Sequence, residues 1–120
     1  MKRVYNWLLI VVLVLGLCSC GQSTEAQWQE QYDLGVRYLS GGNYEEAIIA
    51  FTAAIEIDPN RAEAYVRRGD AYIGYGETTE NLAVALADYE EAIAIDETNA
   101  AAWLGLADVY IRQGEHGKAP

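Results

Sequence analysis

Apolar residues recur at intervals of three and four through the stretch from Tyr44 to Ile57. The positions are Tyr44, Ala47, Ile48, Phe51, Ala54 and Ile55. This spacing puts them on one face of an α-helix. Asn43 followed by Glu46 predicts a capping box at the start of the helix. Asp58-Pro59 predicts its end, because the residue before a proline avoids the α-helical region.

The chain nearly repeats this stretch between Ala85 and Asp96, and smaller markers repeat with it. Gly35, Tyr38 and Gly42 recur at the same mutual spacing as Gly69, Tyr72 and Gly76. Ala47, Phe51 and Ala54 recur in the same way as Ala85, Tyr89 and Ala92. Tyr65, Gly69, Tyr72 and Gly76 recur once more as Trp103, Ala107, Tyr110 and Gly114. Such a period predicts stacked helical units that bury their apolar faces against one another.

The repeated residues resemble the tetratricopeptide (TPR) pattern, a helix–turn–helix unit of about 34 residues. The residues that carry the resemblance are Leu34-Gly35, Tyr38, Ala47, Phe51 and Pro59. One departure is Gln31, which stands where the pattern has tryptophan, with Trp28 one turn earlier. The resemblance covers about residues 28–119. It implies an all-α fold, a short right-handed α-solenoid whose third repeat is incomplete.

We expect the TPR domain to occupy residues 26–120, with repeats at about 28–61, 62–99 and 100–120. The first helix pair is predicted at about Ala26–Leu39 and Tyr44–Ile57, with Gly41-Gly42 forming a left-handed turn between them. Asn60 with Glu63 predicts a second capping box, which opens a helix that reaches about Tyr72. Gly35 and Gly69 stand in mid-helix, where alanine would be better by ~1 kcal/mol, so they are expected to admit a neighbouring helix closely.

The second repeat has four extra residues between Gly76 and Ala85. Four residues make about one helical turn. Leu82, Leu86, Tyr89 and Ile93 therefore stay on one stripe. The insertion is expected to lengthen the following helix at its start, with Thr78 or Thr79 as its cap, and not to form a loop.

The third repeat is predicted to hold one helix, Ala100–Gln113, after which Gly114 to Pro120 begin the next helix without completing it. Its apolar residues are Trp103, Leu104, Leu106, Ala107, Tyr110 and Ile111. One face of this helix is expected to lack a covering helix, although repeat arrays normally end in a polar cap. Either the sequence is a fragment of a longer protein, or a partner or a second copy covers this face.

The N-terminus has the features of an export signal. Met1-Lys-Arg is basic, and Trp7 to Leu17 is an apolar run of 11 residues, shorter than the ~20 that span a bilayer. The run ends in Leu17-Cys18-Ser19-Cys20-Gly21, which resembles a bacterial lipobox. This resemblance implies a signal peptide at 1–19, a diacylglyceryl group on Cys20 and a tether at 20–25. Cys18 is the weaker candidate because bulky Leu17 precedes it. An ordinary signal peptide cut beyond Cys20, or an uncleaved anchor, remains open.

The net charge of the chain limits the classes of binding partner. The formal net charge is −10, and without Lys2 and Arg3 the chain from residue 20 has 6 basic and 18 acidic residues, or −12. Such a surface disfavours direct binding to nucleic acid or anionic lipid and mildly favours a basic partner. Acidic surfaces also keep proteins soluble without further function.

Little in the sequence predicts catalysis, and we expect no enzyme activity, metal site or cofactor. His116 is the only histidine, and no cysteine follows Cys20. The sequence therefore offers no convincing Cys–His or Ser–His nucleophile pair and no disulfide framework. The pairs Glu45-Glu46 and Glu90-Glu91 are adjacent in predicted helices. They favour a solvated surface, because adjacent helical residues do not converge.

The TPR resemblance implies that the first helices of successive units line a concave groove for peptides. The candidate groove residues are Tyr32, Val36, Val66, Asp70, Ile73, Leu104, Asp108 and Ile111. Asp70 and Asp108 occupy the same place in successive units, so an acidic row beside an apolar strip is predicted. Some family members grip a peptide's terminal carboxylate with Lys, Asn and Arg. Of the matching positions here only Arg67 is basic, which disfavours that clamp. Alternatively, the aromatic and aliphatic candidates only pack between units.

The sequence therefore predicts a lipid-anchored TPR module on the extracytoplasmic side of a bacterial membrane, held there by the lipid on Cys20. Its expected partner is a protein or peptide, basic or amphipathic in character, and not nucleic acid. The structural alternative is a lipoprotein that self-associates through its unpaired last helix.

Overall fold

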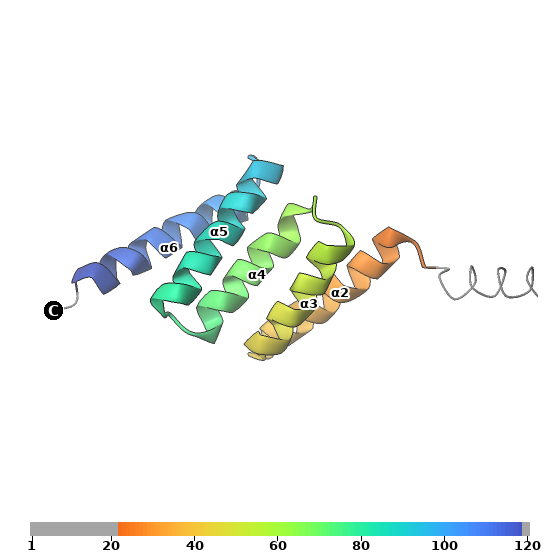
Figure 1. Cartoon of the computed structure of the whole chain (residues 1–120), viewed down its shortest axis with the longest axis horizontal. Helices are drawn as coiled ribbons and strands as arrows, with labels where there is room; N and C mark the ends of the chain where they lie inside the picture. The colour runs from red at the N-terminus through yellow and green to blue at the C-terminus, as the bar shows by residue number, and fades with distance from the viewer. Residues whose placement is uncertain (1–21, 119–120) are drawn as a thin grey trace, which may run out of the picture.

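The computed structural model describes residues 22–118, and within this range all regular structure is helical (Figure 1). The helices are α2 Thr24–Ser40, α3 Tyr44–Ile57, α4 Ala62–Tyr75, α5 Thr79–Ile95 and α6 Ala100–Lys118. The prediction of an all-α fold is confirmed. The predicted signal peptide and Cys20 lie outside the described residues. In the described part, no helix is both long and apolar enough to cross a membrane.

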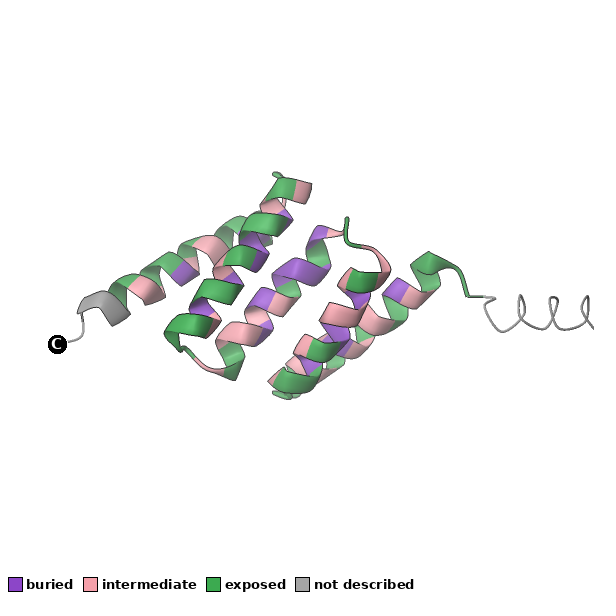
Figure 2. Cartoon of the chain, in the orientation of Figure 1, coloured by how far each residue is buried: buried purple, intermediate pink, exposed green. Residues whose placement is uncertain are grey.

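Consecutive helices pack side by side and form two layers. α4 contacts α2 on one side and α6 on the other, whereas the described parts of α3 and α5 do not contact each other. The first helices of the three units, α2, α4 and α6, thus make one layer, and the second helices, α3 and α5, cover it. Burial follows this arrangement, with buried positions turned toward neighbouring helices and exposed positions outward (Figure 2).

Hydroxyl side chains cap two of the helices. The Oγ of Ser23 accepts from the N–H of Ala26 at 3.1 Å, and the Oγ1 of Thr78 accepts from Asn81 at 3.1 Å. The predicted capping role of Thr78 is confirmed. Between α2 and α3, Gly42 has a φ of 76°, so the predicted left-handed turn is confirmed as well.

The two predicted capping boxes are wrong. Asn43 precedes α3, but its side chain makes no capping hydrogen bond. Its backbone N–H is taken by the carbonyl of Tyr38 in the turn, and its carbonyl accepts from Ala47. α4 begins one residue later than expected, with Arg61 in the N-cap position. Asn60 is held in a local turn instead, because its N–H donates to Oδ1 of Asp58 at 3.1 Å.

The insertion in the second unit lengthens its second helix, as predicted. The repeat that matches Ala47 to Ala85 also matches Tyr44, the first residue of α3, to Leu82. α5 begins before this match, at Thr79, so most of the inserted turn is helical. Leu82 and Tyr89 from the predicted stripe are each 1% exposed.

Glycine allows close packing inside both complete units. Phe51 is fully buried against Gly35, where an added Cβ would lie 2.5 Å from Cε1 of the ring. Tyr89 lies in the same way against Gly69, with a corresponding distance of 3.0 Å. The expectation that these glycines admit a neighbouring helix closely is confirmed.

α6 differs from the prediction at its C-terminal end. The helix continues through Gly114 to Lys118, although Gly114 matches Gly42 and Gly76 in the repeat. In the described residues only Gly42 adopts a left-handed φ. A continued helix keeps the backbone groups hydrogen-bonded, and no packed second helix in the described range supports a turn at Gly114.

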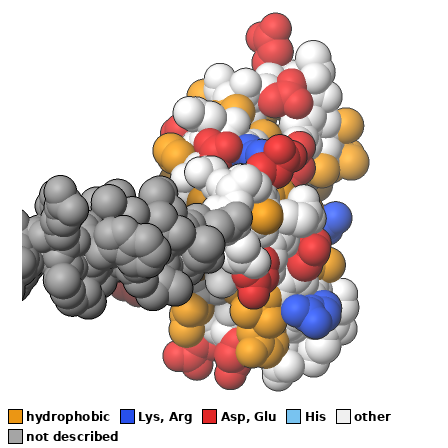
Figure 3. All heavy atoms as spheres, turned by 90° about the vertical axis from the view of Figure 1, so that its right-hand side faces the viewer, with side chains coloured by type: hydrophobic (Ala, Val, Ile, Leu, Met, Phe, Trp, Pro, Cys, Tyr) orange, Lys and Arg blue, Asp and Glu red, His pale blue; other side chains and the backbone are white. Residues whose placement is uncertain are grey.

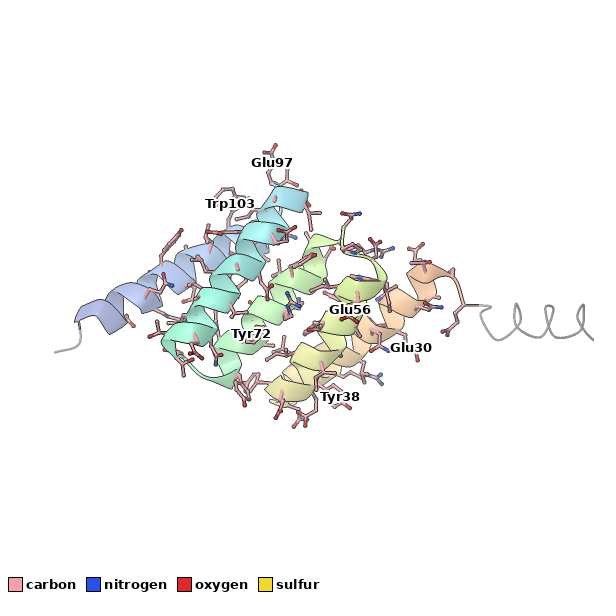
Figure 4. All side chains as sticks on the ribbon, in the orientation of Figure 1. Glu30, Tyr38, Glu56, Tyr72, Glu97 and Trp103 are labelled. Atoms are coloured by element: carbon pink, nitrogen blue, oxygen red, sulfur yellow. The ribbon has the colours of Figure 1, made fainter. Side chains whose placement is uncertain are left out.

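The predicted open face of α6 is present. Trp103 is 50% exposed and Tyr110 is 54% exposed, whereas Tyr65, the match of Trp103 in the second unit, is 9% exposed. The indole N–H of Trp103 donates to the carbonyl of Glu97 at 2.8 Å, and both side chains stand at the outer edge of the molecule (Figure 4). We call Trp103, Ala107 and Tyr110 the open face.

Candidate functional site

Tyr89 reaches from α5 between the two neighbouring first helices. Its ring lies against Gly69 of α4 and Gly105 of α6, and a Cβ at Gly105 would collide with the ring. Its hydroxyl donates to Oδ1 of Asp70 at 2.5 Å. A buried side chain of the second helix layer therefore fixes a carboxylate on the first layer.

Beside this contact lies an open hollow of about 400 Å³ between α4 and α6. Its lining residues are Asp70, Ile73, Tyr89, Ala101, Leu104, Gly105 and Asp108. We call it the α4–α6 groove. It combines apolar walls with two carboxylates, the mixture by which a small number of polar groups orients a ligand on an apolar surface.

The carboxyl of Asp70 is perturbed by its surroundings. Burial raises its pKa, and the negative charge of Asp108 adds to this effect. The hydrogen bond from Tyr89 and the charge of Arg67 act in the opposite direction. Burial and the bond to Asp70 in turn raise the pKa of the Tyr89 hydroxyl, which therefore stays a donor. Asp70 and Asp108 thus lie near enough to influence each other, and both line the same groove.

Basic side chains partly balance this acidic pair, which the sequence pattern did not predict. Nε of Arg112 lies 3.0 Å from Oδ2 of Asp108, and Arg112 also pairs with Glu77. Nη1 of Arg67 lies 3.8 Å from Oδ2 of Asp70. The predicted acidic row is therefore a mixed-charge strip. Acidic side chains are likewise scattered, not gathered, over the end of the molecule seen in Figure 3.

The eight predicted groove residues do not form one surface. Asp70, Ile73, Leu104 and Asp108 line the α4–α6 groove. Val66 does not serve as a groove floor, because it is 4% exposed and belongs to the core around Tyr89. Ile111 is 61% exposed on α6 and is not part of the groove lining. The sequence prediction also missed Tyr89, Ala101 and Gly105 as lining residues.

Tyr32 and Val36 lie at the first junction, between α2 and α4, and both pack against the cluster around Phe51. The ring of Tyr32 stacks on Trp28 with centroids 4.8 Å apart. A hydrogen bond to Tyr32 is the main cause that raises the pKa of Arg67, despite the opposing effect of burial. Here the alternative interpretation, packing between units, describes Tyr32 and Val36 best.

A second hollow of about 550 Å³ lies beside Trp28 and Arg61. The guanidinium of Arg61 is 4.4 Å from the Trp28 ring centre and bonds Asp58 at 3.1 Å. The Trp28 indole N–H is buried without a hydrogen-bond partner. Because that N–H does not reach the surface, it offers a ligand no donor in this arrangement.

Arg68 forms a partly buried link between three helices. Its guanidinium makes two bonds to Asp88 of α5, at 2.7 and 3.0 Å, and one to Thr52 of α3 at 3.3 Å. Burial raises the pKa of Asp88, while the bonds from Arg68 lower it. The link is structural, since its charges satisfy one another. Across the described residues, no group of three or more His, Cys, Asp or Glu side chains is placed to hold a metal ion.

A family model for TPR repeats matches residues 35–76 and 80–114. The chain belongs to the TPR repeat family. A solved structure described as the first TPR of Spaghetti (RPAP3) bound to the HSP90 peptide SRMEEVD is similar, with a TM-score of 0.68 and 22% sequence identity. The match covers 74% of this chain and 69% of that chain. A search of curated proteins gave no match. At this identity the structural likeness shows the fold of this TPR domain.

Proposed function

We propose that this TPR protein is a non-catalytic binding module that holds a segment of a partner protein in the α4–α6 groove. The observation that carries the proposal is the groove itself, in which Ile73 and Leu104 form apolar walls beside Asp70 and Asp108. Leu104 is 72% exposed, and covering such a side chain yields roughly 25 cal/mol per Å² of buried area.

The peptide complex of the similar Spaghetti TPR supports a peptide as the kind of ligand, but not an acidic one. In the α4–α6 groove both side chains with full charge are carboxylates, and like charges across an interface disfavour binding. We therefore assign this chain a basic or amphipathic partner segment.

The proposal places the module on the extracytoplasmic face of a bacterial membrane. The support is the sequence of the leader, a short apolar run that ends in Leu17-Cys18-Ser19-Cys20. Cys20 would carry the lipid. A tether of a few residues would then keep the groove near the membrane surface, where it would meet envelope proteins.

Site-specific photo-crosslinking tests the groove. A benzoylphenylalanine at Ala101, which is exposed and lines the groove, is compared with one at Ala87, which is also exposed but lies on α5 outside the groove lining. In membranes of the native host, the groove position should crosslink to a discrete polypeptide that the α5 position does not capture. Equal capture at both positions, or none at either, would contradict the proposal.

A second candidate function is self-association through the open face. Trp103 and Tyr110 are each about half exposed there, which is unusual for large aromatic side chains on one helix face. This role is compatible with a free groove, because the groove lining and the open face share no residue.

A further inference from the structure

The two junctions between first helices are built from matched positions, and one of their differences is the residue at the Arg67 position. The repeat that matches Tyr72 to Tyr110 also matches Arg67 of α4 to Gly105 of α6. The aromatic residues that pack behind the two junctions, Phe51 and Tyr89, match as well. The first junction therefore shows how a side chain at the Gly105 position would be used.

At the first junction, Arg67 lies between the two helices. Tyr32 of α2 is close enough to raise the pKa of Arg67, and Nη1 of Arg67 lies 3.8 Å from Oδ2 of Asp70 on its own helix. At the second junction, Gly105 has no side chain to place there. The α4–α6 groove, with its volume of about 400 Å³, opens beside Gly105 instead.

The chain cannot fill this place with its own side chain while Tyr89 keeps its position. A Cβ at residue 105 would collide with the Tyr89 ring, which Gly69 holds from the other side. Tyr89 also fixes Asp70 through its hydroxyl. The same contact that requires glycine at 105 therefore presents a carboxylate to the groove.

We propose that the α4–α6 groove is a subsite for an arginine side chain of the partner, which takes the place that Arg67 takes at the first junction. The guanidinium would lie between Asp70 and Asp108, and its alkyl stem against Ile73 and Leu104. This assignment rests on the proposed peptide-binding function and specifies its selectivity. Arginine suits the site because its planar donors can serve two carboxylates together.

Charge supports this occupant. Oδ1 of Asp70 accepts from Tyr89, and Oδ2 is 3.8 Å from Arg67, beyond hydrogen-bond distance. Asp108 shares its neighbour Arg112 with Glu77. The nearby cations thus leave both groove carboxylates with capacity for a further donor. Asp70 is also partly desolvated, which strengthens its attraction for a bound cation.

The test uses random peptides displayed on phage and panned on the full chain in detergent. A peptide is kept as a groove binder if the chain no longer captures it once a group has been crosslinked into the groove at Ala101. These peptides are synthesised, and each of their arginines is replaced in turn by citrulline, which has the same shape without the charge. The affinities are measured for the natural chain and for the variant with Asp70→Asn and Asp108→Asn. The Asp70→Asn change keeps a side-chain oxygen that can accept the hydrogen bond from the Tyr89 hydroxyl. Glu56→Gln, an exposed charge change on α3, is the matched control.

In each groove-binding peptide, one arginine should contribute most to the affinity for the chain. Its replacement should weaken binding about tenfold or more for the natural chain and for Glu56→Gln, but less than about twofold for the Asn variant. If the Asn variant is less well folded by circular dichroism, Asp108→Asn alone serves in its place. Groove binders without such an arginine, or an equal loss in all variants, would overturn the subsite and leave the binding function standing. Panning that yields no groove binder would overturn the proposed function itself.

Discussion

The hydroxyl of Tyr89 lies 2.5 Å from Oδ1 of Asp70, although Tyr89 belongs to the core and Asp70 to the groove. The tyrosine ring is 1% exposed and passes between two glycines to make this contact. Packing in the second unit and the chemistry of the groove therefore depend on the same side chain.

Tyr89→Phe should destabilise the fold by about 1–3 kcal/mol, because it leaves a partly buried carboxylate without its donor. Urea denaturation at neutral pH measures the change. Tyr75→Phe is the matched control, since Tyr75 is 56% exposed, and it should change the midpoint little. An unchanged midpoint in Tyr89→Phe would show that this bond contributes nothing to folding.

The pH dependence of stability should report Asp70. Burial raises its folded-state pKa, so its carboxyl favours the folded state while it is protonated, below the unfolded value of about 3.9. This contribution is lost as the pH rises through the raised value. In the Asp70→Asn variant, the unfolding free energy should therefore decrease less steeply as the pH rises above the unfolded pKa of this carboxyl. A slope as steep in Asp70→Asn as in the natural chain would assign the effect to other groups, such as Asp88.

Phe51→Ala should cost about 3–5 kcal/mol of stability, because it empties a fully buried site behind Gly35. Ile49→Ala removes an apolar side chain that is 65% exposed on the same helix, and is the control. The two variants are compared by denaturant unfolding. Equal, small losses would mean that the buried face of α3 is misplaced.

The open face of α6 should make the soluble form, residues 21–120, self-associate or fray. Replacing Trp103 and Tyr110 with glutamate should remove any association, whereas Ile49→Glu on α3 should not. Sedimentation equilibrium over a range of concentrations measures the first effect, and hydrogen exchange measures the second. A strictly monomeric form whose α6 is as protected as α4 would contradict this prediction.

Lipidation is tested on the full chain in a bacterial host. Cys20→Ala should abolish incorporation of a labelled fatty acid and release the protein from the membrane fraction. Cys18→Ser should leave both unchanged. Labelled, membrane-bound Cys20→Ala would refute the assignment of Cys20.

Sequence periodicity predicted the helices well, because each unit's contacts depend on residues only a few turns apart. The close-packing role of Gly35 and Gly69 followed from the repeat, as did the longer α5, whereas the rings that lie against these glycines did not. The continuation of α6 through Gly114 did not, because the residue type permits both a turn and a helix, and packing decides between them.

The groove was less predictable than the helices. Asp70 and Asp108 were found from their equal places in the repeat. Val66 was misassigned because its position on α4 turns into the core around Tyr89, which the spacing of apolar residues does not distinguish from a groove wall. The role of Gly105 depends on where the ring of Tyr89 lies, which spacing along one chain does not specify.

Leu104→Asp tests whether the α4–α6 groove is the binding surface. Leu104 is 72% exposed, so the change should leave helicity and melting temperature intact while it puts a third carboxylate on an apolar wall. Val84→Asp, at a residue 39% exposed on α5, is the control. Isothermal titration of a partner identified through the Ala101 crosslink should show affinity reduced about tenfold or more for Leu104→Asp and unchanged for Val84→Asp. Equal affinity of Leu104→Asp and the natural chain would contradict binding in this groove.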